Sequence, residues 1–286
     1  MLKGQIRYQL ICDEQELTPS KKNIIIFVHG QSEYLEKYQF IVNKLNTLNS
    51  DFFFFDLRGH GKSADRLTRP NRTHIESFDQ YVYDLDNIVK MLKEKKYKNI
   101  FIISHSAGGL VSALYLEKNP LAIRAAVLSS PMIEINTKPY PKIMAQAMAQ
   151  TACIVGLGKH VIDNTGGFPA EKLTHDIDFW NSNQIGYELF FGGRPTYGWV
   201  RAGFIGIDSA LKNIKKIKIP LLVFGAGLDQ VVHTSGTEDF VEKLRAENGN
   251  DSVNYIRYEG KKHELLMETN RIEVLKEIEK FFLKFI

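Results

Sequence analysis

Short apolar segments alternate with longer segments of helical periodicity along most of the 286-residue chain. Several of the short segments are unbroken blocks of Ile, Val and Phe, which is typical of strands covered on both faces. The alternation predicts an α/β fold with a mostly parallel sheet flanked by helices. The predicted strands cover residues 5–12, 23–29, 52–56, 99–104, 124–129, 220–225 and 253–258, and the predicted helices cover 38–48, 78–93, 108–118, 237–247 and 270–285.

The alternation of strands and helices stops between residues 131 and 219. An Ala- and Met-rich run over 142–157 is followed by Gly, Pro and several aromatic residues, namely Trp180, Phe190, Phe191, Tyr197 and Trp199. We expect a mainly helical insertion that forms a cap over the edge of the sheet. The predicted domains are therefore a first part of the core over 1–130, the cap over 131–219 and a second part of the core over 220–286.

Composition narrows the classes of partner. Hydrophobic residues make up 44% of the chain and charged residues 24%, as in an ordinary globular protein. The net charge is only +4, and the lysine clusters at 93–98 and 212–218 accompany helical periodicity, so we expect no nucleic-acid partner. The charge is compatible with a weak, accessory attraction to anionic lipid surfaces.

The cysteines and the apolar runs indicate the compartment. Cys12 and Cys153 form neither a disulfide framework nor a metal-binding spacing, and we expect no metal and no cofactor. The start of the chain lacks the apolar core of a signal peptide, and no apolar run reaches the roughly 18 residues that span a bilayer. These patterns predict a cytoplasmic protein. No amphipathic anchor is identifiable, so contact with the inner membrane would be peripheral.

Residues 99–109 read NIFIISHSAGG, an apolar strand that runs directly into Ser106 and a set of small residues. This is the pattern of a nucleophile elbow, in which a tight turn holds a serine above the end of the sheet and small neighbours allow close packing. Ser104 stands where the usual G-x-S-x-G form has its first Gly, and it is small enough to fit. The alternative is a serine in an ordinary turn before a helix.

A serine nucleophile needs a base, and the base needs an orienting acid. Behind such an elbow these residues follow in the order Ser, Asp or Glu, His. Asp229 follows the strand PLLVFGA, and His263 follows the strand VNYIRYEG, so both lie at the carboxyl ends of strands, where open α/β sheets place their sites. The alternatives are a turn aspartate that caps its own loop and a surface histidine.

The oxyanion that forms during attack needs backbone donors. Ala107 directly follows the nucleophile and would supply one N–H group. The predicted strand 23–29 ends in His29-Gly30-Gln31, and Gln31 is the expected second donor, with Gly30 and Ser32 as alternatives.

Two other motifs are incomplete. The stretch GHGKS at 59–63 resembles the end of a phosphate-binding loop, but Asp56 occupies the required earlier Gly position. His263-Glu264 begins like a zinc-protease motif, but Met267 occupies the second His position. We therefore predict neither a nucleotide site nor a zinc site.

The motifs together resemble the α/β-hydrolases, and within them the lysophospholipase and monoacylglycerol lipase family. The family's oxyanion loop reads H-G-x-x-E with a later R-Y pair, which is Lys37-Tyr38 here. Two further segments, 66–85 and 192–203, resemble bacterial lysophospholipases of the inner-membrane type more than monoglyceride lipases. The segments that carry the resemblance are HGQSEYLEKY at 29–38, DLRGHGKS at 56–63, SHSAGG at 104–109, GLDQVV at 227–232 and KKHELLME at 261–268.

The resemblance implies hydrolysis of a carboxylic ester through an acyl-enzyme. Ser106 would be the nucleophile, His263 the base and Asp229 its orienting acid, with the Ala107 and Gln31 amides on the oxyanion. Glu33 and Glu264 would either brace the surrounding loops or be solvated carboxylates.

The expected substrate is a small-molecule lipid ester, with single-chain lysophospholipids as the leading class. The Ala/Met run of the cap suits one acyl chain because methionine adapts to irregular apolar shapes, although it would equally suit packing on its own domain. A monoacylglycerol lipase or a general carboxylesterase is the alternative within ester chemistry. A non-catalytic ligand-binding protein of the same fold is the alternative from another class. The basic residues of the cap are interleaved with acids, so the sequence identifies no head-group site.

Overall fold

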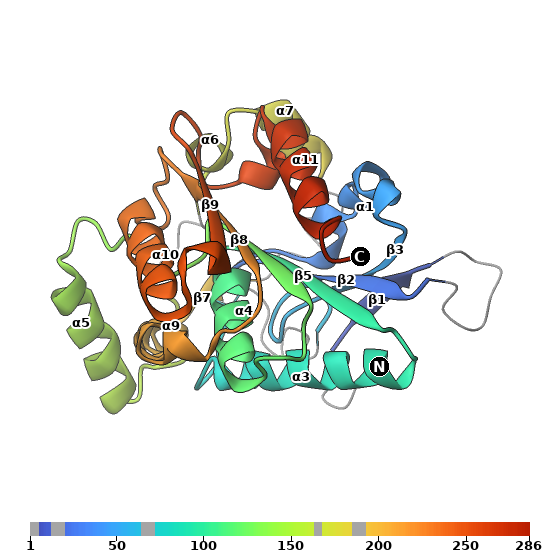
Figure 1. The fold of residues 1–286 in the computed structure, drawn as a ribbon. Coiled ribbons are helices and arrows are strands. Elements are labelled where there is room, and N and C mark those ends of the chain that lie inside the picture. Colours follow the sequence, from blue (N-terminus) through green and yellow to red (C-terminus); the bar gives the residue numbers. More distant parts are fainter. Residues whose placement is uncertain (1–5, 13–20, 64–71, 163–167, 185–192) are drawn as a thin grey trace.

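The computed structural model describes residues 6–12, 21–63, 72–162, 168–184 and 193–286. Its centre is a seven-stranded sheet, and only the edge strand β1 is antiparallel to its neighbour (Figure 1). The strand order β1-β3-β2-β5-β6-β8-β9 places β5 in the middle of the sheet. The strands are β1 (Tyr8–Ile11), β2 (Asn23–Val28), β3 (Ser50–Phe55), β5 (Asn99–His105), β6 (Ala125–Ser129), β8 (Leu221–Ala226) and β9 (Val253–Tyr258).

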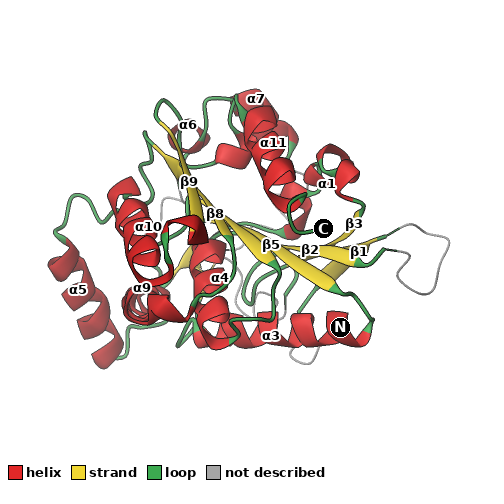
Figure 2. Ribbon diagram, viewed as in Figure 1, coloured by secondary structure: helices red, strands yellow, loops and turns green. Residues whose placement is uncertain are grey.

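Helices cover both faces of this sheet, as its apolar strands require (Figure 2). Nearly all side chains of five central strands are buried, so neither face of these strands is open to water. These strands are β2, β3, β5, β6 and β8. One apolar cluster joins the sheet to α3 (Asp79–Glu94), α4 (Ala107–Lys118), α9 (Tyr197–Asn213) and α10 (Thr234–Asn248), and a second joins it to α1 (Ile41–Lys44) and α11 (Arg271–Phe282). The predicted fold class is confirmed.

All seven predicted strands are present, with ends shifted by a few residues, and residue 5 of the first prediction lies outside the described part of the chain. The predicted helix over 38–48 is wrong. That segment forms three short pieces, η1 (Leu35–Tyr38), α1 (Ile41–Lys44) and η2 (Asn46–Leu48). Asn43, Asn46 and Asn49 are weak helix formers, and Asn49 adopts a left-handed conformation with φ of 44°.

The segment between β6 and β8 leaves the sheet and returns to it, since these two strands are hydrogen-bonded neighbours. Of the aromatic residues predicted there, Phe190 and Phe191 lie outside the described residues. Within this segment, α9 packs against α4 as part of the core, and α5 lies at the outer edge of the molecule beside α9 (Figure 1). Its described elements are α5 (Lys142–Ile154), α6 (Ala170–Leu173), α7 (Ile177–Ser182), β7 (Arg194–Pro195), α9 and η3 (Ile214–Lys216).

A second, two-stranded sheet pairs β7 with β4 (Arg72–Thr73) in parallel. It joins the segment between β6 and β8 to the chain that follows β3. No helix among the described residues is both long and apolar enough to cross a membrane.

Glu117 is a charged residue buried within α4, and its pH dependence is testable. Burial raises the pKa of this carboxyl to about 8, although Lys216 and Lys118 oppose the shift. A raised carboxyl pKa favours the folded state at low pH, and this contribution is lost as the pH rises towards the folded pKa.

We therefore expect Glu117→Gln to unfold like the wild type near pH 5 and to become the more stable protein as the pH rises to 8. The difference in unfolding free energy should grow by up to about 1.4 kcal/mol per pH unit across this range. Urea unfolding at several pH values measures it, with the exposed Glu94→Gln as control. A constant difference between pH 5 and 8 would contradict the assignment.

Candidate active site

Ser106 is the single residue between strand β5 and helix α4. Its backbone lies in a strained region, with φ of 52° and ψ of −120°. Hydrogen bonds of both backbone groups of Ser106 hold this conformation. Its N–H donates to the Ser129 carbonyl at 3.0 Å, and its carbonyl accepts from the N–H groups of Gly109 and Met132. The turn thus holds the serine side chain at the carboxyl edge of the sheet.

Close packing explains the small residues around Ser106. A Cβ atom on Gly108 would clash with the backbone carbonyl of Val28, and one on Gly109 would lie 2.6 Å from Cβ of Pro131. Ser104, at the position of the usual first Gly, is completely buried and donates its hydroxyl hydrogen to the Val127 carbonyl at 3.1 Å. A serine is therefore accommodated there because its only polar group finds a partner.

The structure brings Ser106, His263 and Asp229 into one hydrogen-bonded chain. His263 Nε2 lies 2.9 Å from Ser106 Oγ, and His263 Nδ1 lies 2.7 Å from Asp229 Oδ2. A carboxylate accepts from Nδ1–H, so the neutral imidazole presents Nε2 as the acceptor for the serine hydroxyl. This arrangement can remove the serine proton and stabilise the resulting imidazolium.

The loops that carry His263 and Asp229 are fixed by further hydrogen bonds. Asp229 Oδ1 accepts from the N–H groups of Val231 and Val232 at 2.8 and 3.0 Å, which leaves Oδ2 for His263. The carbonyl of His263 accepts from the Ser130 hydroxyl at 2.8 Å. These bonds orient the acid and the base before any substrate binds.

The loop after β2 lies against Ser106, because a Cβ on Gly30 would be 3.0 Å from Cβ of Ser106. The Gly30 N–H donates to the Glu33 carboxylate, so Gly30 is occupied and is not available as an oxyanion donor. The Ala107 N–H lies in the first turn of α4, where helical N–H groups have no acceptor within the helix. The backbone N–H groups of Ala107 and of Gln31 or Ser32 remain as candidate donors to the oxyanion.

A buried ionic cluster underlies these loops. Lys37 Nζ donates to Glu33, and it donates to Glu264 Oε1 at 2.7 Å; the Tyr38 hydroxyl lies 2.7 Å from Glu33 Oε1 and 3.0 Å from Glu264 Oε2. His105 Nε2 lies 3.4 Å from Glu264 Oε1. We call these five residues the buried ion cluster. It joins three segments: Glu33, Lys37 and Tyr38 follow the oxyanion loop, His105 precedes Ser106 at the elbow, and Glu264 follows His263.

The charges of the cluster compensate one another. Burial disfavours the protonated form of His105, but the negative charges of Glu264 and Glu33 outweigh it and raise the pKa of His105. Burial likewise opposes the carboxylate of Glu264, yet the positive charges of His105 and Lys37 hold the pKa of Glu264 well below its usual range. Glu33 and Glu264 are thus buried and bonded to Lys37 rather than solvated on the surface.

The cluster also bears on metal binding. Ligand atoms of Glu33, His105 and Glu264 lie within 4.8 Å of one another, as a metal site would require. The Lys37 ammonium, however, is hydrogen-bonded to both carboxylates and packs 3.9 Å from the ring of Trp180. The positive charge that a metal would supply is already provided by a side chain.

Two other histidines of the site region have structural roles. His29 Nδ1–H donates to the Gly30 carbonyl and its Nε2 accepts from the Leu57 N–H, which ties the oxyanion loop to the chain after β3. Burial lowers the pKa of His29 to about 4 and that of His60 to about 3. Both are therefore neutral at physiological pH.

The sequence analysis placed Lys37 and Tyr38 only in the oxyanion-loop motif, and it did not predict their contacts in the site or those of His105. The spacing of Glu33 and Lys37, four residues apart, was a signal for an ion pair, although this spacing is also common on exposed helices. Nothing in the sequence connected this pair to Glu264.

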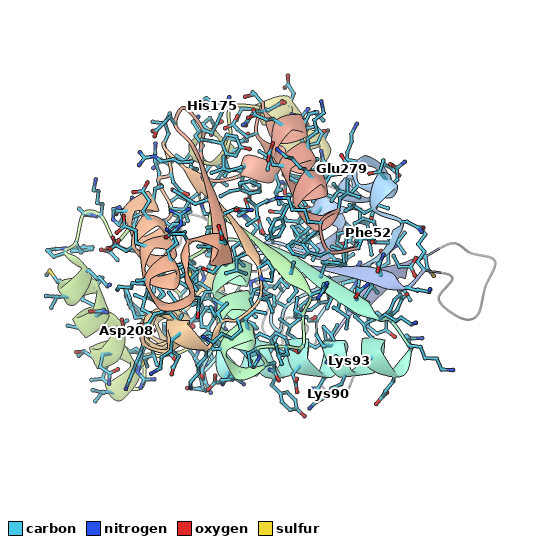
Figure 3. All side chains as sticks on the ribbon, viewed as in Figure 1. Phe52, Lys90, Lys93, His175, Asp208 and Glu279 are labelled. Carbon is cyan, nitrogen blue, oxygen red and sulfur yellow. The ribbon has the colours of Figure 1, made fainter. Side chains whose placement is uncertain are left out.

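We expect Lys37→Met to lower the unfolding free energy by about 3–5 kcal/mol, because it leaves two buried carboxylates without their cation. Urea unfolding measures this value. Lys90→Met on α3 serves as the control, because Lys90 is an exposed lysine, 67% accessible, that projects from the surface and pairs with Asp86 (Figure 3). That change should leave the unfolding free energy nearly unchanged, because exposed ion pairs contribute little. Similar losses for the two variants would contradict the role of the cluster.

Comparisons with known proteins identify the family and the fold. The model of the serine aminopeptidase, S33 family matches residues 19–270. The probable lysophospholipase L2 of Haemophilus influenzae is 28% identical over 91% of this chain and 83% of its own length, and the mouse monoglyceride lipase is 22% identical over 91% and 81%. The crystal structure of a Paleococcus ferrophilus monoacylglycerol lipase superposes with a TM-score of 0.79 at 22% identity, over 98% of this chain and 99% of that one. The predicted resemblance is confirmed, and the chain belongs to the serine aminopeptidase S33 family of hydrolases and has the α/β-hydrolase fold.

Proposed function

We propose that the protein hydrolyses carboxylic esters with Ser106 as the nucleophile, His263 as the base and Asp229 as its orienting acid. The observation that carries this proposal is the unbroken hydrogen-bonded chain from Ser106 Oγ through both nitrogens of His263 to Asp229. A protein that only bound a ligand would need neither this order of groups nor the strained backbone of Ser106.

In the proposed reaction, His263 takes the hydroxyl proton while Ser106 Oγ attacks the ester carbonyl. The N–H groups of Ala107 and Gln31 bind the oxyanion of the tetrahedral intermediate. The C–O bond to the alcohol then breaks, and His263 gives the proton to the departing oxygen. Water attacks the acyl-serine with His263 again as base, and the fatty acid leaves. The occupied Gly30 N–H favours Gln31 over Gly30 as the second donor.

The proposed substrate class is the single-chain lysophospholipids. Support comes from the name of the Haemophilus relative and from the matched segments of the chain, while the name of the mouse relative supports monoacylglycerol as the alternative. Residues 131–219 are the proposed cap, and the acyl chain of the substrate would lie between this cap and the edge of the sheet. General carboxylesterase activity is the further alternative.

We also propose peripheral contact with a membrane surface through α5. This helix buries Ala149 and Ala152 against α9 and turns its large apolar side chains outward, with Ile143 80% and Ile154 73% exposed. Met144, Met148 and Val155 extend the exposed stripe. No acidic residue occurs between 135 and 162, whereas three lysines do, so the surface suits an anionic bilayer.

Ser106→Ala should abolish both fatty-acid release and labelling by a fluorophosphonate probe. Asp229→Asn should keep the serine but lower kcat by roughly 10³- to 10⁴-fold, because the imidazole loses its oriented tautomer. A wild-type protein that is neither labelled nor active on any ester would favour the non-catalytic alternative.

Fatty-acid release from lysophosphatidylcholine, lysophosphatidylethanolamine and monoacylglycerol of one chain length separates the substrate classes. We expect higher kcat/KM for the two lysophospholipids. A preference for monoacylglycerol would assign the protein to the lipase class. Activity on short p-nitrophenyl esters alone would indicate a general carboxylesterase.

Ile143→Ser combined with Ile154→Ser should reduce the fraction of protein that sediments with phosphatidylglycerol-containing vesicles. Hydrolysis of a soluble p-nitrophenyl ester should stay unchanged, because α5 contributes none of the proposed catalytic groups. Ile272→Ser with Leu283→Ser removes two exposed apolar residues near α11 and serves as control. Equal binding by all three proteins would contradict this contact surface.

A further inference from the structure

His105 is the last residue of β5 and directly precedes the nucleophile. Its side chain is buried, and its ring lies close to both the carboxylates and the proposed base. Nε2 is 3.4 Å from Glu264 Oε1 and 3.9 Å from Glu33 Oε1. The centroid of the same ring is 4.7 Å from that of His263. His105 thus links the buried ion cluster to the ring of the base.

The charges of the cluster do not balance without His105. Glu33 and Glu264 are buried carboxylates, and the ammonium of Lys37 is hydrogen-bonded to both. Burial raises the pKa of the Tyr38 hydroxyl well above its usual value, so this group stays neutral. Two negative charges and one positive charge leave one negative charge unbalanced. A protonated His105 brings the sum to zero.

The other titratable groups that face His105 in the described part of the chain do not supply the missing charge. Burial lowers the pKa of His29 to about 4, so its ring is neutral at physiological pH. His263 is paired with Asp229 through Nδ1 and with Ser106 through Nε2. Burial also opposes a charge on His105, but the two carboxylates of the cluster outweigh this effect and raise its pKa.

Hydrogen bonding is consistent with a charged His105 ring. Nε2 faces two carboxylate oxygens, so it carries a hydrogen. Nδ1 has no hydrogen-bond partner among the described residues, so hydrogen bonds do not decide whether it is protonated. The surrounding charge decides it, because a buried carboxylate without a balancing cation is costly.

The charge of the cluster acts on the base. An unbalanced negative charge near His263 would add to that of Asp229 and stabilise the protonated imidazole. A protonated imidazole cannot accept the proton of Ser106, so hydrolysis would require a higher pH. When His105 is protonated, the cluster is neutral and Asp229 acts on the base without this addition.

We propose that His105 is a positively charged positioning residue for His263. As an imidazolium it balances the buried ion cluster, and it thereby extends the pH range of hydrolysis downward. It acts through the base rather than on the substrate. The inference rests on the proposed function, because the charge of His105 matters for hydrolysis only if His263 is the base.

The pH profile of kcat/KM for p-nitrophenyl butyrate tests this role, since its acid limb reports protonation of the base in the free enzyme. His105→Gln keeps an amide donor for Glu264 but removes the charge, so the limb should move to higher pH by about one pH unit or more. His105→Gln/Glu264→Gln removes one positive and one negative charge, and its limb should return close to that of the wild type. A purely structural role predicts no such return, because the double variant loses more contacts. His160→Gln replaces an exposed histidine and should leave the limb in place.

Nitrogen NMR of the histidine rings gives a second readout that needs no activity. A ring protonated on both nitrogens gives two N–H signals, whereas a neutral ring contains one bare nitrogen with a distinct shift. The wild type should show a doubly protonated ring at pH 7 that is absent from both His105 variants. The titration of His263, identified by its loss in His263→Gln, should have its midpoint at higher pH in His105→Gln than in the wild type.

A neutral His105 ring at pH 7, or an acid limb that stays in place in His105→Gln, would overturn the inference. So would a double variant whose acid limb remains with that of the single variant. A wild type that hydrolyses no ester would contradict the proposed function instead. The ring signals of His105 and the titration of His263 would then show by themselves whether the charge is present and acts on that ring.

Discussion

The close approach of helix α4 to the end of strand β2 is the constraint on which the site depends. Gly108 packs directly on the carbonyl groups of Val28 and His29, so the helix can begin there only if the chain turns within one residue after β5. That residue is Ser106, and its strained backbone is a consequence of the packing. The same contact brings the oxyanion loop, which follows β2, against the serine. One packing requirement therefore positions both the nucleophile and its neighbouring donors.

The buried ion cluster holds the loops of the site together. Three loops that are distant in the sequence meet beneath the site, and the buried ion cluster joins them through Lys37 and two carboxylates. Removing five polar groups from water is costly, and the cost is offset only when each charge has a partner. The arrangement tolerates little movement of any one loop, because displacing Glu33 or Glu264 would remove one of the two carboxylates that partner the buried Lys37. Rigidity of this kind preorganises a hydrolytic site.

The sheet was predictable because burial on both faces leaves solid apolar blocks such as NIIIFV at Asn23–Val28. The proximity of Ser106, Asp229 and His263 was predictable because each follows a strand, and the carboxyl ends of parallel strands lie at one edge of the sheet. The ion cluster was not, since Lys37 and Glu264 are 227 positions apart and a buried lysine has no distinct sequence pattern. The helix over 38–48 failed because tertiary contacts and weak helix formers divided an apparently periodic segment.

In the segment between β6 and β8, the sequence predicted a helix but not its contacts. The Ala/Met run was correctly placed on a helix, but periodicity alone does not say which face is covered. In α5 the covered face holds Ala149 and Ala152, and the larger apolar residues are exposed. The pairing of Arg72 with Arg194 likewise joins positions 122 residues apart through two strands of two residues each. Such short strands carry no alternation from which they could be predicted.

The most direct test of the account is to trap the acyl group on the enzyme. The protein is mixed with lysophosphatidylcholine, quenched in acid within milliseconds to seconds, and digested for mass spectrometry. The account predicts one added acyl group on the peptide that contains Ser106, and none in Ser106→Ala. Fatty-acid release that continues without an acylated peptide, or with the acyl group on another residue, would contradict it.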